Sequence, residues 1–419
     1  MLDREQPDEI NARLARYAAT LDARDLWPEV TASAFRAAQT EVARVVAAVL
    51  AGGPSPVPLR LPPEADARAL GVAASAAGIG PLLGYWCSMG RIAADPPVAG
   101  QLATHLEHGR RRAARLRLEL EHVLVPLAER GIEVFVLKGS HTGYRYFPEP
   151  GTRPATDIDL LVMPAQGRAA EAVLRDLGFV EGSRAEAWRS HWTPPNAGTF
   201  RSLALAHADN PWSLDLHVSL DRRLFQGLTT GLDSLEPTAG EVWNEFSRPV
   251  RILPQPRLLA YLAVHASGHF YSITLLRLVE LVLVIQRDFA GRPESWRAFS
   301  ELVHRARAAR FAFPALHLVE RLAPGTVDPP ILEQVAAAAP PRLRRLVYDT
   351  TPGSAQRLHP YPRGERYVWV ASLPELVGAL AEVAWPREGD RLVSPRAALA
   401  VQWRRVRGIL HRLVARRRR

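Results

Sequence analysis

Residues 132–162 read IEVFVLKGSHTGYRYFPEPGTRPATDIDLLV, and this stretch decides the fold. It opens with a short apolar, β-branched run, IEVFVL, which has the length and composition of a strand. It closes with TDIDLLV (156–162), a second strand in which Asp157 and Asp159 alternate with aliphatic residues. Because successive side chains of a strand point to opposite faces, both carboxylates are expected on one face. The stretch therefore predicts two strands joined by a Gly-Ser turn, a helical turn and a Pro/Gly loop.

The two aspartates are the first sign of chemistry. Two carboxylates a few ångströms apart repel each other unless a cation lies between them, and hard oxygens suit Mg²⁺ or Mn²⁺. A D-x-D pair is, however, also common as a solvated strand edge. The turn Gly139-Ser140 favours chemistry, because glycine lets backbone N–H groups approach a phosphate closely and serine adds a hydroxyl donor.

A third acid follows in SLDLHV (213–218), where Asp215 and His217 share one face of a further predicted strand. We expect this strand to form a hairpin with SLALAH (202–207), because ADNPW between them is typical of a turn. Three acids on adjacent strands beside a Gly-Ser turn predict a two-metal site for phosphoryl or nucleotidyl transfer.

Helical patterns surround this stretch, so the sequence predicts an α+β fold. Residues 8–50, 101–130, 254–270 and 273–289 have apolar residues spaced for one helical face, and the arginines at 110–112 are interpreted as a solvated face. The predicted parts are a helical N-terminal region (1–129), an α+β core (130–232), a helical C-terminal domain (233–350), and a Pro/Gly loop with a basic amphipathic helical tail (351–419).

The net charge of +10 is uneven, because the chain ends in RRVRGILHRLVARRRR (404–419). A basic amphipathic helix of this kind favours polyanions, and RNA or an anionic membrane surface are both candidate partners. A solvated helix without a partner is the alternative. The sequence of the tail therefore does not identify its partner.

Lys138 is the only lysine in the chain, and it directly precedes the Gly-Ser turn. One interpretation is that this place needs a compact ammonium rather than the planar fork of arginine; the other is chance. Arg153 could clamp a triphosphate with two parallel bonds, or anchor its loop through a salt bridge. His265 and His269 share a helical face, which suits a substrate contact, a buried polar role or a metal, but the protease motif H-E-x-x-H is absent.

Cysteine usage and the chain start bear on the compartment. A single cysteine, Cys87, excludes an intramolecular disulfide and fits a reducing compartment. Its apolar surroundings favour a structural thiol over a nucleophile. The charged start MLDREQPDEI has no signal-peptide core, and the longest apolar runs fall far short of the roughly 20 residues of a membrane span. The sequence therefore predicts a cytoplasmic protein.

The motifs resemble the polymerase-β-type nucleotidyltransferase superfamily, whose pattern is a hydrophobic run, Gly-Ser, a spacer, D-h-D-h and a later acid. In detail they resemble its bacterial branch called the uncharacterised nucleotidyltransferase family, over roughly residues 75–300. The matching motifs are LKG (137–139), YFPEPGTRP (146–154), DIDLLV (157–162) and DLHV (215–218). That branch also carries a helix with spaced histidines, an arginine and an acid, which fits His265, His269, Arg277 and Glu280.

The resemblance implies a polymerase-β-like core, a short mixed sheet flanked by helices. It implies that Gly139 and Ser140 hold the β- and γ-phosphates of an NTP and that Asp157 and Asp159 hold Mg²⁺ or Mn²⁺. Asp215 would complete the second metal site and help deprotonate an acceptor hydroxyl. The other expected nucleotide-site residues are His217, His265, His269 and Arg277, together with Lys138 and Arg153, which are added because they lie beside the motif and could neutralise triphosphate charge.

The reaction expected from this resemblance is transfer of NMP, with AMP the first choice, from an NTP to an acceptor hydroxyl or similar group with release of pyrophosphate. The acceptor could be a small molecule, a peptide, a protein or an RNA end. Two alternatives stay open: a non-catalytic nucleotide-binding scaffold on the same fold, and a phosphotransferase that uses the same acids.

Overall fold

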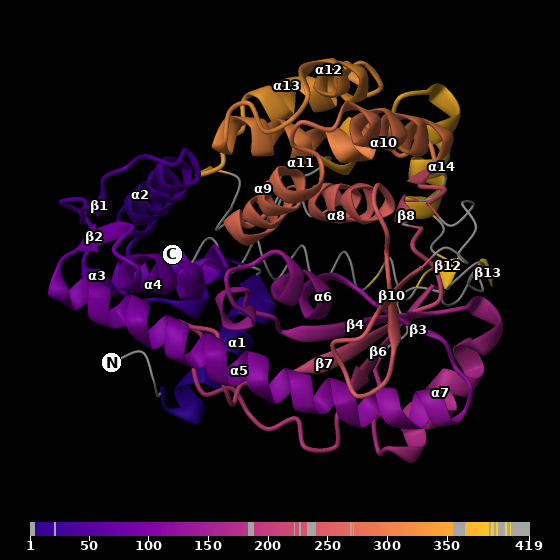
Figure 1. Ribbon diagram of the computed structural model, residues 1–419, viewed down its shortest axis with the longest axis horizontal. Helices are drawn as coiled ribbons and strands as arrows, with labels where there is room; N and C mark the ends of the chain where they lie inside the picture. Colours follow the sequence, from indigo (N-terminus) through magenta and orange to yellow (C-terminus); the bar gives the residue numbers. More distant parts are fainter. Residues whose placement is uncertain are drawn as a thin grey trace.

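The computed structural model describes residues 5–182 without 21, residues 188–354 without 222, 226–227, 233–239, 269 and 271, and residues 365–392 without 385–386 and 389–390, together with 399 and 403. Apart from 399 and 403, the predicted tail helix lies outside the described residues, as does His269. Figure 1 shows a group of N-terminal helices on the left, a sheet on the lower right, and a second group of helices above the sheet.

The N-terminal region contains the helices α1 (Pro7–Thr20), α2 (Ala32–Leu50), α3 (Ala67–Ala76) and α4 (Gly80–Ser88), with a short parallel pair β1 (Val57–Leu59) and β2 (Ile92–Ala94). The expected helix over 8–50 is interrupted by a 3₁₀ turn at Ala23–Leu26. Polar side chains explain the break: Asp22 accepts from the N–H of Arg24, and Thr31 caps α2 by accepting from the N–H of Ala34.

Seven strands form one mixed sheet in the order β10-β11-β3-β4-β7-β6-β5. β4 pairs antiparallel with β3 and parallel with β7, so it is a central strand. The bounds are β3 (Val134–Val136), β4 (Asp157–Val162), β5 (Val180–Glu181), β6 (Arg189–Thr193), β7 (Ser213–His217), β10 (Glu241–Trp243) and β11 (Val250–Ile252). The predicted fold class, an α+β core with a short mixed sheet and helical regions on either side, is confirmed.

One face of the sheet packs on two helices, α5 (Pro96–Glu129) and α7 (Gly167–Asp176), which run beneath it in Figure 1. Aliphatic side chains of β4 and β7 share a core with the apolar stripe of α5 and with Val173 and Leu174 of α7. α7 ends just before Gly178, which has a φ of 82°, a conformation that glycine adopts without steric cost.

The opposite face lies toward the C-terminal helices. Phe135, Leu137 and Leu161 from β3, the turn after it and β4 join the core of these helices. Their bounds are α8 (Arg257–Gly268), α9 (Leu275–Asp288), α10 (Pro293–Arg305), α11 (Ala309–Leu322), α12 (Pro329–Ala337), α13 (Pro341–Tyr348) and α14 (Leu373–Ala384). α6 (Lys138–Arg145) lies between the sheet and this group. Two small ribbons, β8–β9 (Arg223–Phe225, Leu228–Thr229) and β12–β13 (Arg387–Glu388, Arg391–Leu392), stand apart from the main sheet.

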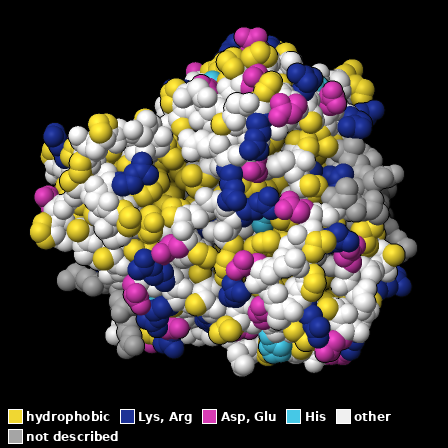
Figure 2. Space-filling view, in the orientation of Figure 1, with side chains coloured by type: hydrophobic (Ala, Val, Ile, Leu, Met, Phe, Trp, Pro, Cys, Tyr) yellow, Lys and Arg dark blue, Asp and Glu magenta, His cyan; other side chains and the backbone are white. Residues whose placement is uncertain are grey.

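Charged side chains of both signs are scattered over the face in Figure 2, with a group of Lys and Arg near its middle. In the same orientation this is where α6 and α9 meet. At that junction Arg145 of α6 and Arg287 of α9 both lie over the ring of Tyr146, at 6.0 and 5.5 Å. Among the described helices none is by itself long and apolar enough to cross a membrane; α3 and α4 reach that apolar length only as a pair bent by 118°.

The predicted hairpin of 202–207 with 213–218 is wrong. β7 pairs instead with β6 (Arg189–Thr193), and residues 202–207 form an irregular loop. The side chain of Asn210 explains the loop, because its Oδ1 accepts from the N–H groups of Arg201 and Ser202 while its Nδ2 donates to the carbonyl of Ser202. These bonds satisfy backbone groups that a strand would otherwise pair.

Residues 241–252 add β10 and β11 to the sheet, although they follow position 232, the predicted end of the core. The four-part division of the chain remains a prediction.

Candidate functional site

Two acids meet because β4 and β7 are parallel and in register. Asp159 lies opposite Asp215, and both residues are buried, at 3% and 4% exposure. His217 follows two positions later on the same face, with its Nε2 3.0 Å from Asp159 Oδ1. One ligand atom from each of the three residues can be chosen so that all lie within 4.8 Å of one another. This spacing suits a single bound cation.

Asp157 lies at the start of β4, half-buried, where the hydroxyl of Thr156 donates to its Oδ1 at 3.3 Å. Burial raises the pKa of Asp157, and the negative charges of Asp159 and Asp215 raise it further, although Lys138 opposes them. Asp157 is therefore close enough to feel both other acids. The cation-sized group in the described residues nevertheless consists of Asp159, Asp215 and His217. A metal-binding role for Asp157 stays a prediction.

The ammonium of Lys138 reaches into this group. Its Nζ donates to Asp159 Oδ1 at 2.7 Å, and both side chains are buried. Burial alone would lower the pKa of Lys138, but Asp159, Tyr261 and Asp157 outweigh it and raise that pKa. Burial likewise works against the charged form of Asp159, and Lys138 with His217 overcomes it, so the pKa of Asp159 lies well below its usual range. The two side chains form a buried charged pair.

Asp215 is held by two side chains of β6. Arg189 donates to its Oδ2 at 2.9 Å, and Nδ1 of His191 lies 2.9 Å from its Oδ1. His191 stands directly opposite Asp215 in the antiparallel pairing of β6 with β7. Neither residue was identified from the sequence. The signal was the alternation in RSHWT: Ser190 and Trp192 are buried, while Arg189 and His191 face the other way.

Gly139 and Ser140 form the first turn of α6, directly after Lys138. A side chain at Gly139 would meet the guanidinium of Arg153, because a Cβ there would lie 2.5 Å from its Nη1. Arg153 itself donates to both oxygens of Glu280 on α9, at 2.8 and 3.2 Å. The hydroxyl of Thr142 also donates to Glu280. Arg153 thus makes the loop-anchoring ion pair that was one of its two interpretations, while it also covers the Gly-Ser turn.

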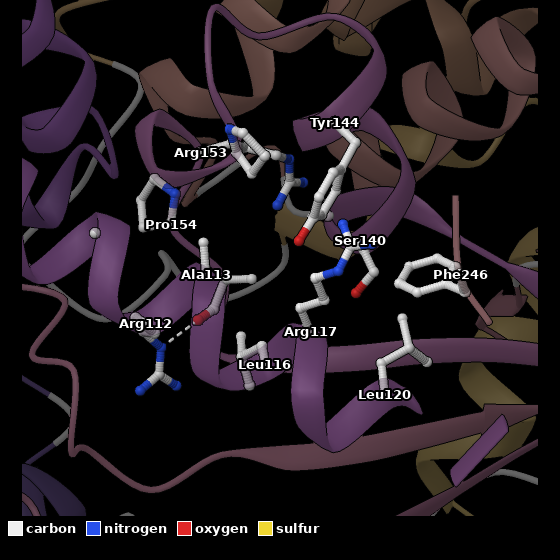
Figure 3. Close-up of a pocket in the computed structure, with 14 residues that line it drawn as sticks. Arg112, Ala113, Leu116, Arg117, Leu120, Ser140, Tyr144, Arg153, Pro154 and Phe246 are labelled. Atoms are coloured by element: carbon white, nitrogen blue, oxygen red, sulfur yellow. Dashed lines mark hydrogen bonds between the residues drawn. The ribbon is translucent and has the colours of Figure 1, made fainter. Parts of the chain in front are cut away.

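A pocket lies between α5, α6 and the loop before β4, and Gly139 and Ser140 form part of its wall. Figure 3 shows Arg117, Tyr144 and Arg153 pointing toward one another around Ser140. Arg117 packs on the rings of Tyr144 and Phe246, 5.5 Å from each centroid. The pocket combines guanidinium groups, aromatic rings and a helix start, which together suit a nucleotide.

Arg112 also lines this pocket, but Figure 3 shows its guanidinium pointing away from the centre. The prediction of a solvated face at 110–112 is wrong for this residue, which is 2% exposed. It lies four residues before Leu116 and eight before Leu120, so helical spacing places it on the apolar face. Burial lowers its pKa to about 10.

The guanidinium of Arg112 donates to backbone carbonyls just before β4 and β7, namely those of Ala155, Thr156, His207, Asn210 and Pro211. These are the two strands that carry the acids. Arg112 therefore ties together the segments that set where the acids begin, and it is a positioning residue that the sequence interpretation missed.

The remaining predicted residues lie further along the C-terminal helices. The half-buried ring of His265 stacks on Tyr261, with centroids 6.1 Å apart, and Tyr261 is in turn close enough to Lys138 to raise its pKa. Arg277 lies half-buried in the first turn of α9, three residues before Glu280. Cys87 is half-buried, and burial raises its pKa, which disfavours a thiolate nucleophile.

A mixed sheet that brings a D-x-D strand beside a third acid, next to a Gly-Ser helix start, defines a protein of the nucleotidyltransferase class. The chain belongs to the family described as uncharacterised nucleotidyltransferase, whose model matches residues 63–324. This span runs from just before α3 to just after α11 and includes the whole seven-stranded sheet. The resemblance inferred from the motifs is thereby confirmed. Comparison with curated proteins and with solved structures gave no match.

Proposed function

We propose that the chain transfers NMP, with AMP the first choice, from an NTP to an acceptor hydroxyl or similar group and releases pyrophosphate. The observation that carries the proposal is the convergence of Asp159, Asp215 and His217 next to the Gly-Ser turn. The two carboxylates supply the hard oxygens that suit Mg²⁺ or Mn²⁺. Because the ligand atoms of the three residues lie within 4.8 Å of one another, they fit a single ion without rearrangement of the strands.

A divalent ion held there would polarise the α-phosphate and orient the acceptor oxygen. The chain's own residues do the rest. The first turn of α6 offers backbone N–H groups and the Ser140 hydroxyl to the phosphates. Lys138 supplies fixed positive charge, and Arg189 and His191 hold the carboxylate of Asp215 in a single orientation. Pre-set groups of this kind do not have to reorganise during the reaction.

In the proposed step the acceptor oxygen forms a bond to the α-phosphorus, and the bond from that phosphorus to the bridging oxygen of the β-phosphate breaks. The electron pair of the broken bond leaves on pyrophosphate, and the acceptor proton passes to Asp215. The pocket beside Ser140 would hold part of the nucleotide, with Arg117 and Arg153 near its phosphates; Asp159, Asp215 and His217 are not among the residues that line it.

Product analysis tests this proposal. The purified chain is incubated with ATP labelled at the α-phosphate, Mg²⁺ or Mn²⁺, and a cell extract divided into small-molecule, protein and RNA fractions. Nucleotidyl transfer puts the label on one fraction and releases pyrophosphate in equal amount. ADP with an unlabelled acceptor would instead show a phosphotransferase, and ATP binding without either product would show a scaffold. Repeating the assay with GTP, CTP and UTP tests the choice of AMP.

The Asp159→Asn variant is the matched control for contaminating activity, because the Asp159 carboxylate belongs to the cation-sized group. Asp176→Asn supplies a second control, since Asp176 is exposed and pairs only at the surface with Arg130. The proposal requires that the first variant lose the labelled product and that the second keep it.

A further inference from the structure

The inference concerns the number of metal ions and rests on the proposed function. Asp159 Oδ1 already has two nitrogen neighbours, Nε2 of His217 at 3.0 Å and Nζ of Lys138 at 2.7 Å. His217 belongs to the cation-sized group with Asp215, whereas Lys138 approaches from α6. Asp159 Oδ1 therefore lies between the candidate metal site and the ammonium of Lys138.

The Lys138 ammonium is the group that could take the place of a second ion. In a two-metal transfer site the ions lie roughly 3.5–4 Å apart, and one of them neutralises the leaving group. The ammonium contacts Asp159 directly and is close enough to Asp157 for that charge to raise the pKa of Lys138. It also directly precedes Gly139 and Ser140, the expected phosphate contacts. Lys138 therefore reaches Asp159 with its side chain and adjoins the expected phosphate contacts through its backbone.

The backbone of Lys138 adopts a sterically unfavourable conformation. Lys138 has a φ of 37°, in the left-handed region that non-glycine residues rarely adopt. The residue is 8% exposed, its carbonyl accepts from the hydroxyl of Thr142, and Tyr261 of α8 lies near its ammonium. A surface lysine with free rotamers would show none of these constraints. They fix one charged atom at one place.

We propose that the site binds one divalent ion, at Asp159, Asp215 and His217, and that the Lys138 ammonium takes the place of a second ion on the leaving-group side. Lys138 forms no covalent bond in the step; it balances charge on the departing pyrophosphate. This role explains why the chain has lysine at this one position, although its other Lys or Arg positions are all arginine. A compact ammonium resembles a metal ion more closely than a planar guanidinium does.

Equilibrium dialysis with Mn²⁺ tests the number of ions without relying on turnover. An α,β-methylene analogue of ATP, which cannot release pyrophosphate, is present at equal concentration on both sides of the membrane. The expected excess of Mn²⁺ on the protein side is one ion per wild-type chain. Two ions per chain would overturn the inference and leave the proposed function intact. No bound ion would overturn both, so the two failures are distinguishable.

Substitution of the lysine sharpens the test. Lys138→Met removes the charge but keeps the length of the side chain, and the freed carboxylates should then take a second Mn²⁺, giving two ions per chain. Lys138→Arg keeps a positive charge and should remain at one. A single ion in the methionine variant would contradict the inference. Thermal melting of each variant shows whether it is folded. If the methionine variant is not folded, the ion count of the wild-type chain decides whether the site binds one ion or two.

The position of the ion has its own control. In Asp159→Asn the proposed ion loses a carboxylate ligand. The affinity for Mn²⁺ should therefore fall by at least tenfold. Unchanged affinity would place the bound ion elsewhere, on the nucleotide alone, and would overturn the assignment to Asp159, Asp215 and His217. Anomalous scattering from a Mn²⁺ crystal would give the same answer as a single peak beside Asp159.

Discussion

The two faces of β4 and β7 are equally buried but chemically opposite. On one face Ile158, Leu160, Leu214 and Leu216 are at most 1% exposed and pack on α5 and α7. On the other face Asp159, Asp215 and His217 are 3% to 4% exposed. Burial stabilises the apolar face at about 25 cal/mol per Å². Burial of the polar face is unfavourable unless every group finds a partner, so that face depends on other elements.

The partners of the polar face come from separate parts of the chain. Lys138 of α6 neutralises Asp159, and Arg189 and His191 of β6 bind Asp215. Removal of either charge of the buried Lys138–Asp159 pair leaves the other without its opposite charge, which is more harmful than the loss of a contact. The comparison teaches that the apolar face needs only volume and shape, whereas the polar face needs particular atoms at particular distances.

The largest effect is expected for Asp159→Asn, which removes a charge from the polar face without changing its shape. Nucleotidyl transfer should fall at least about a thousand-fold, or about 4 kcal/mol, because a metal ligand supplies several kcal/mol to the transition state. The measurement is the initial rate of pyrophosphate release at saturating NTP. A rate within tenfold of wild type would remove Asp159 from the mechanism.

The same variant should also melt at a lower temperature than wild type. Relief of the repulsion between the two carboxylates would by itself let the melting temperature hold or rise. In the structure, Asp159 is the partner of buried Lys138, so its loss leaves an unpaired ammonium. The pKa of Asp159 is depressed on folding, so this stability is present above the usual aspartate pKa and lost as the pH falls through the folded value.

On the apolar face, Leu214→Ala should lower the free energy of unfolding by about 2–5 kcal/mol, because Leu214 is fully buried and the cavity cannot close completely. The transfer rate per folded molecule should stay within about twofold, since the acids lie on the other side of the strand. Denaturant unfolding and activity on the same samples measure the two quantities. Leu118→Ala on α5, where the side chain is 71% exposed, is the matched control and should change neither.

A third prediction tests how the two faces are held in register. Arg112→Met removes the donor for carbonyls before β4 and β7 and should lower the free energy of unfolding by about 3 kcal/mol, since hydrogen bonds from charged groups are among the stronger ones. Unlike Leu214→Ala, it should also weaken Mn²⁺ binding, because the acids shift together with their strands. Equal Mn²⁺ affinity in the two variants would show that Arg112 acts on stability alone. The exposed neighbour Arg111, changed to Met, is the control.

The smallest expected effect belongs to Asp157→Asn. Burial and the charge of Asp159 raise the pKa of Asp157 on folding, so its ionised form opposes folding at neutral pH. The variant should be more stable than wild type by up to about 1 kcal/mol at pH 7. The difference should vanish as the pH falls through the raised pKa to the usual aspartate value, since wild type is then protonated in both states. Urea unfolding across that pH range measures it, and a loss of stability at pH 7 would contradict the assignment.

Much of the site could be predicted from the sequence because its strongest signals are local. Alternation in TDIDLLV and SLDLHV places the acids on one face, and the Gly-Ser turn follows a strand in the printed order. β6 was not predicted as a strand because its sequence, RSHWT, contains no strong apolar run. The segment 202–207, which is nearer to β7 in the chain, was therefore predicted as its partner. Side-chain bonds from Asn210 prevent that pairing, and no periodicity reports them.

By itself, the sequence determined the class of fold, the face on which the acids lie and the family to which the chain belongs, because these follow from local periodicity and short motifs. Only the tertiary structure decided the partners of those acids: His191 and Arg189 for Asp215, Lys138 and His217 for Asp159, and Glu280 for Arg153. Glu280 lies 127 positions from Arg153 in the chain. Electrostatic energy depends on separation in space rather than along the chain, so the charge of each acid is set by residues that the folded chain alone brings near.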